Sequence, residues 1–299
     1  MIAEPQKDKA DEKYSDLLLT FYGQLRSVFT DCVKYSTITS CEMIALDAIQ
    51  VKSATKSFGT KKAVNNLNLS VQAGEIRGLL GPNGSGKSTT MKMILGLLKL
   101  DAGQIVICGL DVAERPVEVR RIIGYVPETP RLYEYLTAAE YLDFIGVAYG
   151  IEPEERKRRI QNMLEALQMN AHLNEIMSGF SQGMKQKVAL TAALMHRPKI
   201  LILDEPLNGL DPRSARIVKD LLHRLAAEGA AILFSTHILE IAEAICNNVT
   251  ILHDGLVLAE GTVQELRSMA GSPGLTLEEL FLKLTGSEDT AKVVEALRL

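Results

Sequence analysis

The chain has 299 residues, 46% of them hydrophobic, which is enough apolar material for one large domain or two lobes that each bury a core. A mainly disordered chain is therefore excluded. The 33 basic and 37 acidic residues give a formal net charge of -4, so the chain as a whole lacks the positive charge of a protein that binds a nucleic-acid backbone, although a local basic patch is compatible with it.

The sequence carries no signal for secretion or for a membrane span. No apolar run approaches the roughly 18 to 20 residues that cross a bilayer, and Met1 to Ser15 mix acidic and basic residues. The four cysteines form no Cys-x-x-Cys pair, which favours reduced thiols in a cytosolic protein over a disulfide framework or a zinc site. We expect a chain that is neither secreted nor membrane-spanning and that has no structural metal.

Residues 1–42 differ from the rest and are predicted to form an N-terminal extension, partly disordered. After a polar start, apolar residues recur at helical spacing from Leu17 to Phe29, interrupted by Gly23. Only Arg26 and Lys34 offer positive charge for a membrane-surface helix. An appended tail, or a helix packed on the main body, is therefore the favoured interpretation.

From residue 46 the pattern turns to strands. Apolar and polar residues alternate over 67–71, which predicts a half-exposed antiparallel sheet. Ile76 to Leu80 then leads through a glycine-rich loop into an apolar helix over 87–98. This order of strand, loop and helix is the beginning of a βα unit.

Helical spacing runs from Leu136 to Met169, and Pro153 suits the first turn of a helix. Acidic residues precede the basic run Arg156 to Arg159. Acids at a helix start and bases further along are typical of a solvated face, so we favour that interpretation over a nucleic-acid patch.

The following segments alternate between strand and helix. Lys199 to Pro206 and 231–235 are predicted buried strands, and 217–225 is an amphipathic helix that ends by Gly229. The alternation predicts a largely parallel sheet.

The last part of the chain contains a turn and one more helix. Asp254-Gly255 lies between two apolar runs and predicts a two-residue hairpin. Small residues over 268–274 predict a linker into a final helix over 277–284.

The segment Gly81-Pro82-Asn83-Gly84-Ser85-Gly86-Lys87-Ser88 fits the phosphate-binding loop pattern between a strand and a helix. Its glycines let backbone N–H groups turn toward phosphates, and the helix N-terminus adds positive potential. Lys87 is assigned to the β- and γ-phosphates and Ser88 to Mg²⁺. A purely structural glycine-rich turn is the disfavoured alternative.

An acidic pair, Asp204-Glu205, ends the predicted strand over 199–206. Consecutive strand side chains face opposite ways, so we assign Asp204 to the metal and Glu205 to the attacking water as base. Such a pair alone is usually a solvated sheet edge, but its place after a phosphate loop favours the catalytic assignment.

A third segment, Phe180-Ser181-Gln182-Gly183-Met184, precedes a predicted helix. Ser181 is a good N-cap, and Gly183 would let a phosphate approach the helix N-terminus. Read alone, this segment is an ordinary helix start.

Taken in order, these segments resemble the ATP-binding-cassette (ABC) ATPases over about residues 46–262. The phosphate loop matches that of the family, Ser181-Gln182-Gly183 resembles its signature, and Leu201 to Glu205 resembles its metal strand and catalytic glutamate. The other matching positions are a D-loop, a switch histidine and an aromatic residue that stacks on adenine: Gly209-Leu210-Asp211, Ser235-Thr236-His237 and Phe58.

The resemblance implies an α/β fold with a P-loop NTPase core and a mainly parallel sheet, an antiparallel β subdomain and an inserted helical subdomain at about 130–190. The ABC ATPase domain would span 43–267, and 268–299 would form a C-terminal helical tail.

The resemblance also implies a head-to-tail dimer, a homodimer or a heterodimer with a paralogue, that holds two ATP molecules with Mg²⁺. Each site would combine residues of one chain with Ser181 and Gly183 of the other, and closure would exclude water. The residues of the first chain would be Gly81 to Thr89, Asp204, Glu205 and His237, with Lys87, Glu205 and His237 as the catalytic groups.

Two positions depart from the commonest family pattern. The signature reads Phe-Ser-Gln-Gly-Met rather than Leu-Ser-Gly-Gly-Gln but keeps Ser181 and Gly183. Glu128 replaces the Q-loop glutamine, as is familiar in the ABC-2 exporter subfamily, and we assign it to Mg²⁺. Residues 133–137 and 277–284 also resemble that subfamily.

The implied function is the ATP-hydrolysing subunit of an exporter, peripheral on the cytoplasmic face of the cell membrane, with a separate transmembrane permease as partner. The alternative is a soluble ABC ATPase that acts on nucleic acid or ribosomes. Such proteins usually carry a coiled-coil insertion, zinc motifs or two cassettes, and none is visible, so no nucleic acid is expected. In a regulatory module that binds ATP without hydrolysing it, Glu205 or His237 would be expected to be replaced, but both residues are present.

Overall fold

The computed structural model describes residues 47–269 and 276–285. These residues belong to one of the two units into which the chain divides, the one that begins at Ala45. The predicted extension over 1–42 lies outside the described residues, as do most of the predicted linker and the end of the predicted C-terminal tail.

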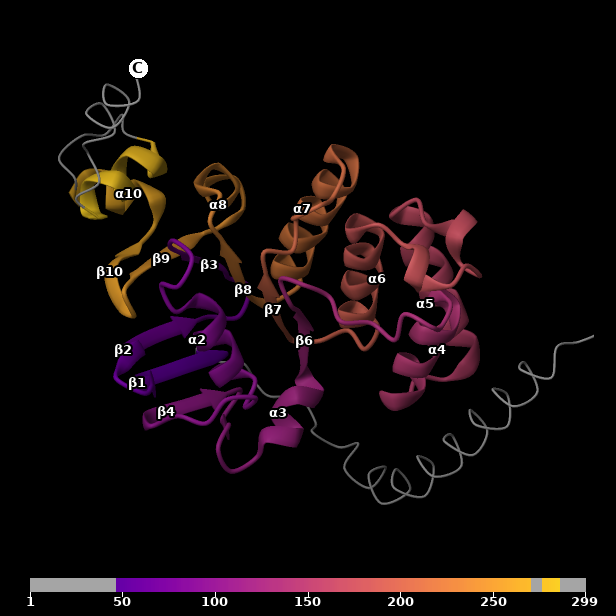
Figure 1. The fold of residues 1–299 in the computed structure, drawn as a ribbon, viewed down its shortest axis with the longest axis horizontal. Coiled ribbons are helices and arrows are strands. Elements are labelled where there is room, and N and C mark those ends of the chain that lie inside the picture. The colour runs from indigo at the N-terminus through magenta and orange to yellow at the C-terminus, as the bar shows by residue number, and fades with distance from the viewer. Residues whose placement is uncertain (1–46, 270–275, 286–299) are drawn as a thin grey trace, which may run out of the picture. The chain divides into compact units, whose positions relative to one another are not determined.

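The predicted antiparallel sheet is confirmed as four strands in the order β2-β1-β4-β5 (Figure 1). They are β1 (Ile49–Phe58), β2 (Lys61–Val71), β4 (Ala102–Ile107) and β5 (Leu110–Asp111). Ile49 pairs with both Val71 and Ile107. Leu67, Leu69 and Val71 are buried while the residues between them are more exposed, because alternate side chains of a strand face opposite sides.

The second sheet has six strands in the order β10-β9-β3-β8-β7-β6. They are β3 (Ile76–Leu80), β6 (Ile123–Val126), β7 (Ile200–Asp204), β8 (Ala231–Thr236), β9 (Asn248–His253) and β10 (Leu256–Gly261). All neighbours run parallel except β9 and β10, which form the predicted hairpin around Asp254-Gly255. The prediction of a largely parallel sheet is therefore confirmed.

Helix α2 (Lys87–Ile94) connects the two sheets and is shorter than predicted. It ends before residue 98 because Gly96 turns the chain with a φ of +63°. Met91 and Ile94 of α2 share one core with Ile49 of the first sheet and Ile202 of the second. The phosphate loop in front of α2 is therefore held by both sheets.

The predicted helical run from Leu136 to Met169 is two helices, α4 (Ala138–Ala148) and α5 (Pro153–Ala166). The chain breaks at Gly150, whose φ is +68°, and Pro153 opens α5 as predicted. Together with α6 (Gln182–Leu194) they bury Leu142, Leu164 and Val188 in a common core. Figure 1 shows this group of helices beyond the β6 edge of the six-stranded sheet.

The basic run at the start of α5 is occupied by ion pairs. Arg156 contacts Asp143, and Arg158 and Arg159 both contact Glu155. These guanidinium groups already have carboxylate partners, so the run does not offer a free basic patch for nucleic acid. The predicted solvated face describes Arg158, which is 59% exposed, but not Arg156 and Arg159, which are 14% and 19% exposed.

The remaining α-helices of the described residues are α3 (Pro116–Ile122), α7 (Pro212–Ala227), α8 (Leu239–Ile245), α9 (Val263–Met269) and α10 (Leu277–Thr285). Helix α7 starts earlier than the predicted 217 because Asp211 caps it, accepting a bond from the Ser214 N–H at 2.9 Å. Helix α10 confirms the predicted final helix, whereas α9 extends into the predicted linker.

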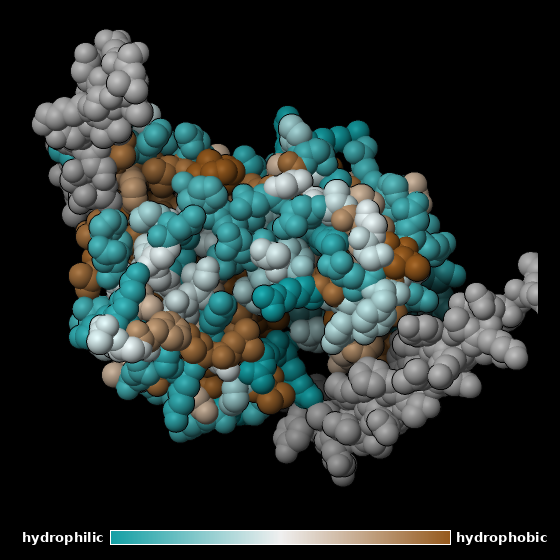
Figure 2. Space-filling model, viewed as in Figure 1, coloured by the Kyte–Doolittle hydropathy of each residue, from teal (hydrophilic) through white to brown (hydrophobic). Residues whose placement is uncertain are grey.

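Hydrophilic residues cover most of the face in Figure 2, and hydrophobic residues reach the surface in small groups, one of them over α2. Leu97, just after α2, is 59% exposed. Over the residues that the structure describes, every helix is too short or too polar to cross a bilayer.

The packing between the ends of α4 and α6 can be tested through the pH dependence of stability, because it involves His196. His196 follows α6 and stacks on Tyr149, which ends α4, with 3.8 Å between ring centroids and 7° between ring planes. The backbone of Ile123 is the one hydrogen-bonding group of the described chain that acts on the ring, and it favours the protonated form only weakly against burial. Burial lowers the pKa of His196 from 6.5 to about 4.

We expect the free energy of unfolding to fall as the pH decreases from about 6.5 to about 4, because the unfolded chain then binds a proton that folded His196 does not. The loss is at most about 3 kcal/mol, reduced by partial exposure of the ring. Urea unfolding at about pH 7 and about pH 5 measures it. His196→Phe keeps the stack and should flatten the profile, whereas the exposed control His223→Gln should not; equal slopes in both variants would contradict the assignment.

Candidate functional site

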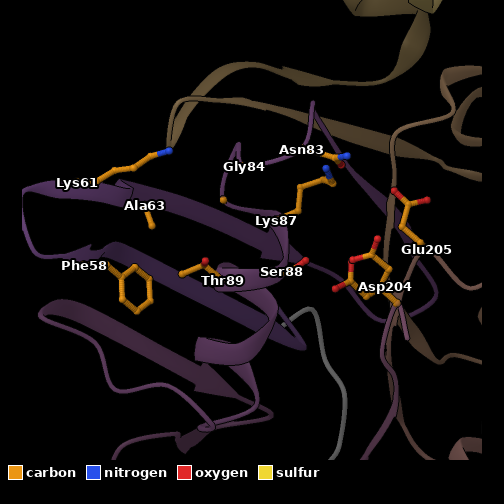
Figure 3. A pocket seen from close by; sticks show the side chains of 12 residues that line it. Phe58, Lys61, Ala63, Asn83, Gly84, Lys87, Ser88, Thr89, Asp204 and Glu205 are labelled. Atoms are coloured by element: carbon orange, nitrogen blue, oxygen red, sulfur yellow. The ribbon is translucent and has the colours of Figure 1, made fainter. Parts of the chain in front are cut away.

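A cavity of about 520 Å³ lies between the antiparallel sheet, the phosphate loop and the carboxyl ends of β6 and β7 (Figure 3). Parallel strands bring their carboxyl ends to one edge of the sheet, which is the usual place for a ligand site in such folds. The cavity is lined by Phe58, Lys61, Ala63, Asn83, Gly84, Gly86, Lys87, Ser88, Thr89, Glu128, Asp204 and Glu205. Segments that are far apart in the sequence therefore meet here, and most of them carry predicted site residues.

The phosphate loop closes tightly onto α2. Gly86 is the N-cap of α2 with a φ of +111°, and a Cβ placed there would lie 2.5 Å from the Ala63 carbonyl oxygen. Only glycine avoids both the backbone strain and this collision. Gly84 is different, since no described atom lies within 4 Å of its Cβ position. The loop is therefore packed against β2 at Gly86, whereas at Gly84 it faces open space.

Lys87 is the buried cation of the site. Its Nζ donates to the carbonyl oxygens of Gly81 at 2.6 Å and Pro82 at 3.1 Å. Burial lowers the pKa of Lys87, and the nearby carboxylates of Glu205, Asp204 and Glu128 act in the opposite direction. An ammonium surrounded by three carboxylates and backbone oxygens suits a ligand that carries both anionic groups and a divalent cation.

Asp204 and Glu205 are both buried and are positioned by Ser235 of the neighbouring strand β8. The Ser235 hydroxyl donates to the Asp204 carboxylate, and the Glu205 N–H donates to the Ser235 hydroxyl oxygen at 3.1 Å. Glu205 has a φ of +50°, a left-handed conformation that costs about 1–3 kcal/mol in a residue other than glycine. Such strain often occurs at functional sites, where surrounding structure enforces it.

His237 lies beside Glu205, with Nδ1 2.7 Å from Oε1. It is half exposed, whereas the Glu205 side chain is only 6% exposed. Glu205 lines the cavity and His237 does not. The pair has the geometry of a general base whose carboxylate is oriented by a second residue.

The predicted signature residues lie elsewhere. Ser181 caps α6, its hydroxyl accepting a bond from the Met184 N–H at 3.2 Å. A Cβ at Gly183 would lie 2.3 Å from the Gly209 carbonyl oxygen, so only glycine fits there. Of the described residues that line the cavity, none is Ser181, Gln182 or Gly183.

Helix α6 is also fixed to the loop that follows β7. Gln186 Nε2 donates to the Pro206 carbonyl oxygen at 3.0 Å, and Lys187 Nζ lies 2.9 Å from the Asp211 carboxylate. Bonds from Ser214 and Lys187 lower the pKa of Asp211, so it is ionised in this contact. The segment 180–184 and the loop that follows β7 are therefore joined through α6.

Some cavity residues escaped the sequence analysis. Lys61 and Ala63 line the cavity because β2 begins directly over the phosphate loop. In Figure 3, Lys61 lies on the same side of the cavity as Phe58. The sequence gives no local signal for either residue, because their position depends on how the two sheets pack.

The residues present fit the magnesium assignment only in combination with a ligand. Within the described ranges, no group of three or more His, Cys, Asp or Glu side chains could hold a metal by itself. Ser88, Asp204 and Glu128 offer a hydroxyl and two carboxylates at the same cavity, which are oxygen donors that suit Mg²⁺. The remaining donors would have to be ligand oxygens and water.

The sequence profile of the family described as ABC transporter matches residues 64–208. The ABC-type transporter ATP-binding protein EcsA of Bacillus subtilis is 38% identical over 80% of this chain and 97% of its own length. The Nod factor export ATP-binding protein I of Burkholderia lata is 38% identical over 73% of this chain and 72% of its own length.

Solved structures give the same result. The ATP-binding subunit of an ABC transporter superposes with a TM-score of 0.76 and 39% identity, covering 80% of this chain and 99% of that one. The dimeric cassette MJ0796, in a post-hydrolysis state bound to ADP and phosphate, has a TM-score of 0.67 and 28% identity, covering 72% of this chain and 98% of that one. The predicted fold class is therefore confirmed.

Proposed function

The chain belongs to the ABC transporter ATP-binding proteins, and we propose that it is the ATP-hydrolysing subunit of an ABC-2 type exporter whose membrane-spanning part is a separate polypeptide. ATP hydrolysis is the expected activity of the family. The observation that carries ATP hydrolysis by this chain is one cavity that joins Phe58, the phosphate loop, Glu128 and the Asp204-Glu205 pair. The name of the Nod factor relative, an export protein, supports the direction of transport.

Within this proposal each cavity residue has a role in binding or hydrolysis. Phe58, 54% exposed, offers a ring face to adenine, and the loop from Gly81 to Thr89 binds the phosphates through backbone N–H groups and Lys87. Mg²⁺, when bound, neutralises charge on the phosphate oxygens, with Ser88, Asp204 and Glu128 as its protein-side donors. Glu205 accepts the proton of the attacking water while His237 orients its carboxylate.

We further propose that two chains close head to tail, as a homodimer or with a paralogue. Ser181 and Gly183 lie at the N-terminus of α6 but not at this chain's own cavity, so they are available for the nucleotide of the partner chain. The dimeric state of the related cassette MJ0796 supports this arrangement. Helix α6 contacts the Pro206 carbonyl group and the Asp211 carboxylate, which lie in the loop after β7. These contacts would then connect the chain's own nucleotide site to the nucleotide of the partner chain.

The loop over 129–136 is the proposed contact with the permease, which would hold the subunit at the cytoplasmic face of the membrane. Tyr133 and Tyr135 are 48% and 67% exposed, and Tyr133 also packs on Tyr141 and Phe144 of α4. Glu134 forms a 2.7 Å ion pair with Lys185 of α6. The loop thus joins Glu128 in the cavity to the signature helix.

A photo-crosslinker at Tyr135 in native membranes tests the partnership. We expect a crosslink to one membrane-spanning polypeptide, and no such product from the same probe at Glu228, an exposed residue at the end of α7. Products that contain ribosomal protein or nucleic acid would instead favour the non-transport alternative, which the ion-paired arginines of α5 do not support.

Glu128 provides a prediction about metal dependence. A carboxylate near the γ-phosphate repels it unless Mg²⁺ lies between them, and two charges at about 4 Å interact by roughly 4 kcal/mol at an effective dielectric of 20. Glu128→Gln should therefore keep much of the ATPase activity but shift the Mg²⁺ titration to modestly higher concentration. Glu128→Ala should uncouple hydrolysis from transport.

Measuring ATPase activity against Mg²⁺ concentration distinguishes this role from that of a solvated loop acid. If the curves of wild type and Glu128→Gln superimpose, and Glu128→Ala transports normally, both the metal role and the coupling role are wrong.

A further inference from the structure

The turn between β9 and β10 lies against the phosphate loop, although the two are far apart in the sequence. The Gly255 N–H donates to the Ser85 carbonyl oxygen at 3.0 Å, and the Gly255 carbonyl oxygen accepts a bond from the Asn65 N–H at 2.8 Å. One residue of the turn is therefore bonded both to the phosphate loop and to β2. Figure 1 shows β9 and β10 beside the segment that leads into α2.

The contact is too close for a side chain. A Cβ at Gly255 would lie 2.9 Å from the Ala63 carbonyl oxygen and 3.0 Å from that of Lys62. Gly255 also has a φ of +78°, which glycine adopts without strain. Because Ala63 lines the cavity, Gly255 is packed between one cavity wall and the phosphate loop.

The strand before the turn supports the loop at its first residue as well. A Cβ at Gly81 would lie 2.2 Å from the Leu252 carbonyl oxygen on β9. Ser85 is almost fully buried, and its backbone also closes the loop through its N–H, which donates to the Pro82 carbonyl oxygen at 3.2 Å. Backbone contacts from β9 and the turn thus reach the loop at Gly81 and at Ser85.

We propose that the β9–β10 turn is part of the nucleotide site and that Gly255 is its positioning residue, although it does not line the cavity. The inference rests on the nucleotide site proposed above. Gly255 holds the Ser85 carbonyl group outward, which keeps the loop N–H groups directed at the phosphates. Glu205 and His237 are held by β7 and β8 instead, so disturbing Gly255 should affect ATP binding much more than the hydrolytic step.

Two glycine substitutions with matched backbone strain test this. Gly109 has a φ of +79°, and no described atom lies within 4 Å of its Cβ position. Gly255→Ala and Gly109→Ala therefore share the strain, and only Gly255→Ala creates the collision. Calorimetry should give a Kd for ATP that is about tenfold higher in Gly255→Ala, equivalent to ~1.4 kcal/mol, and nearly unchanged in Gly109→Ala. The kcat of both variants should stay close to that of wild type.

Hydrogen exchange on the unmodified protein gives an independent readout should Gly255→Ala fold poorly. ATP should slow amide exchange in the β9–β10 turn, because it stabilises the phosphate loop, whose Ser85 carbonyl oxygen accepts the bond from the Gly255 N–H. ATP should not change the exchange rate in the turn around Gly109. Equal Kd values for the two variants, or exchange in the β9–β10 turn that ATP does not alter, would overturn the inference. If wild type itself fails to bind ATP, the proposed function fails instead.

Discussion

Lys87→Ala should abolish ATP hydrolysis and severely weaken ATP binding. Lys87 is the buried cation of the cavity, and Glu205, Asp204 and Glu128 surround it with negative charge. Without its ammonium group the phosphates would meet these carboxylates with one compensating charge fewer. Loss of a buried charge partner costs about 3–5 kcal/mol, which lowers affinity by roughly two to four orders of magnitude.

The measurement is ATP affinity by calorimetry together with phosphate release. Lys87→Met, which keeps the apolar stem of the side chain, separates loss of charge from loss of packing. Lys61→Ala is the matched control, because Lys61 lines the same cavity on the Phe58 side and should change affinity far less. Turnover at the wild-type rate in Lys87→Ala would remove the assignment of the phosphate loop.

Local chemistry explains why the phosphate loop was predictable and the ends of helices were not. The loop lies between β3 and α2, so its strand, glycines, lysine and helix start are consecutive in the sequence. The apolar spacing of a helix, in contrast, continues past the point where the backbone turns. Gly96 and Gly150 both adopt positive φ and end helices that periodicity alone extends.

The missed elements are short or irregular. Strand β5 has two residues and α3 has seven, too few for a period to emerge. Strand β1 lies where the sequence pattern turns to strands, but its bounds were not predicted, because register shifts between Val51 and Ser57 interrupt the alternation of buried and exposed residues. Such irregular strands are recognised only from their partners.

The candidate site shows a similar division. Asp204 and Glu205 are visible as an acidic pair after an apolar strand, but the bonds of Ser235 to both require the pairing of β7 with β8. Gly255 is visible as a turn residue, and its contact with the phosphate loop requires the whole sheet. Sequence patterns therefore predict groups that carry chemistry better than groups that hold them in place.

Glu205→Gln should bind ATP and accumulate as an ATP-dependent dimer that hydrolyses ATP very slowly. The amide has the shape of the carboxylate and can still accept a bond from His237, so the geometry of the site is kept. The amide cannot accept the proton of the attacking water, and loss of a general base typically slows a reaction by about 10²–10⁴-fold. In the proposed head-to-tail dimer, the two chains would then stay closed, because the bound ATP that joins them is not consumed.

Light scattering during size-exclusion chromatography, with and without saturating MgATP at micromolar protein, measures the dimer. The double variant Lys87→Ala and Glu205→Gln is the control, since it should stay monomeric for lack of bound nucleotide. Ser181→Ala combined with Glu205→Gln tests the interface, because Ser181 is assigned to the nucleotide of the partner chain.

The two readouts of Glu205→Gln separate two claims. Slow hydrolysis with monomer alone would keep Glu205 as the base and count against the head-to-tail dimer. A stable dimer with wild-type hydrolysis would keep the dimer and move the base elsewhere, although Glu205 is the buried carboxylate that lines the cavity next to His237. The result that supports both claims is slow hydrolysis together with a dimer that is lost when Lys87→Ala is added. In that case bound nucleotide forms the dimer interface, and hydrolysis by Glu205 governs the release of the nucleotide.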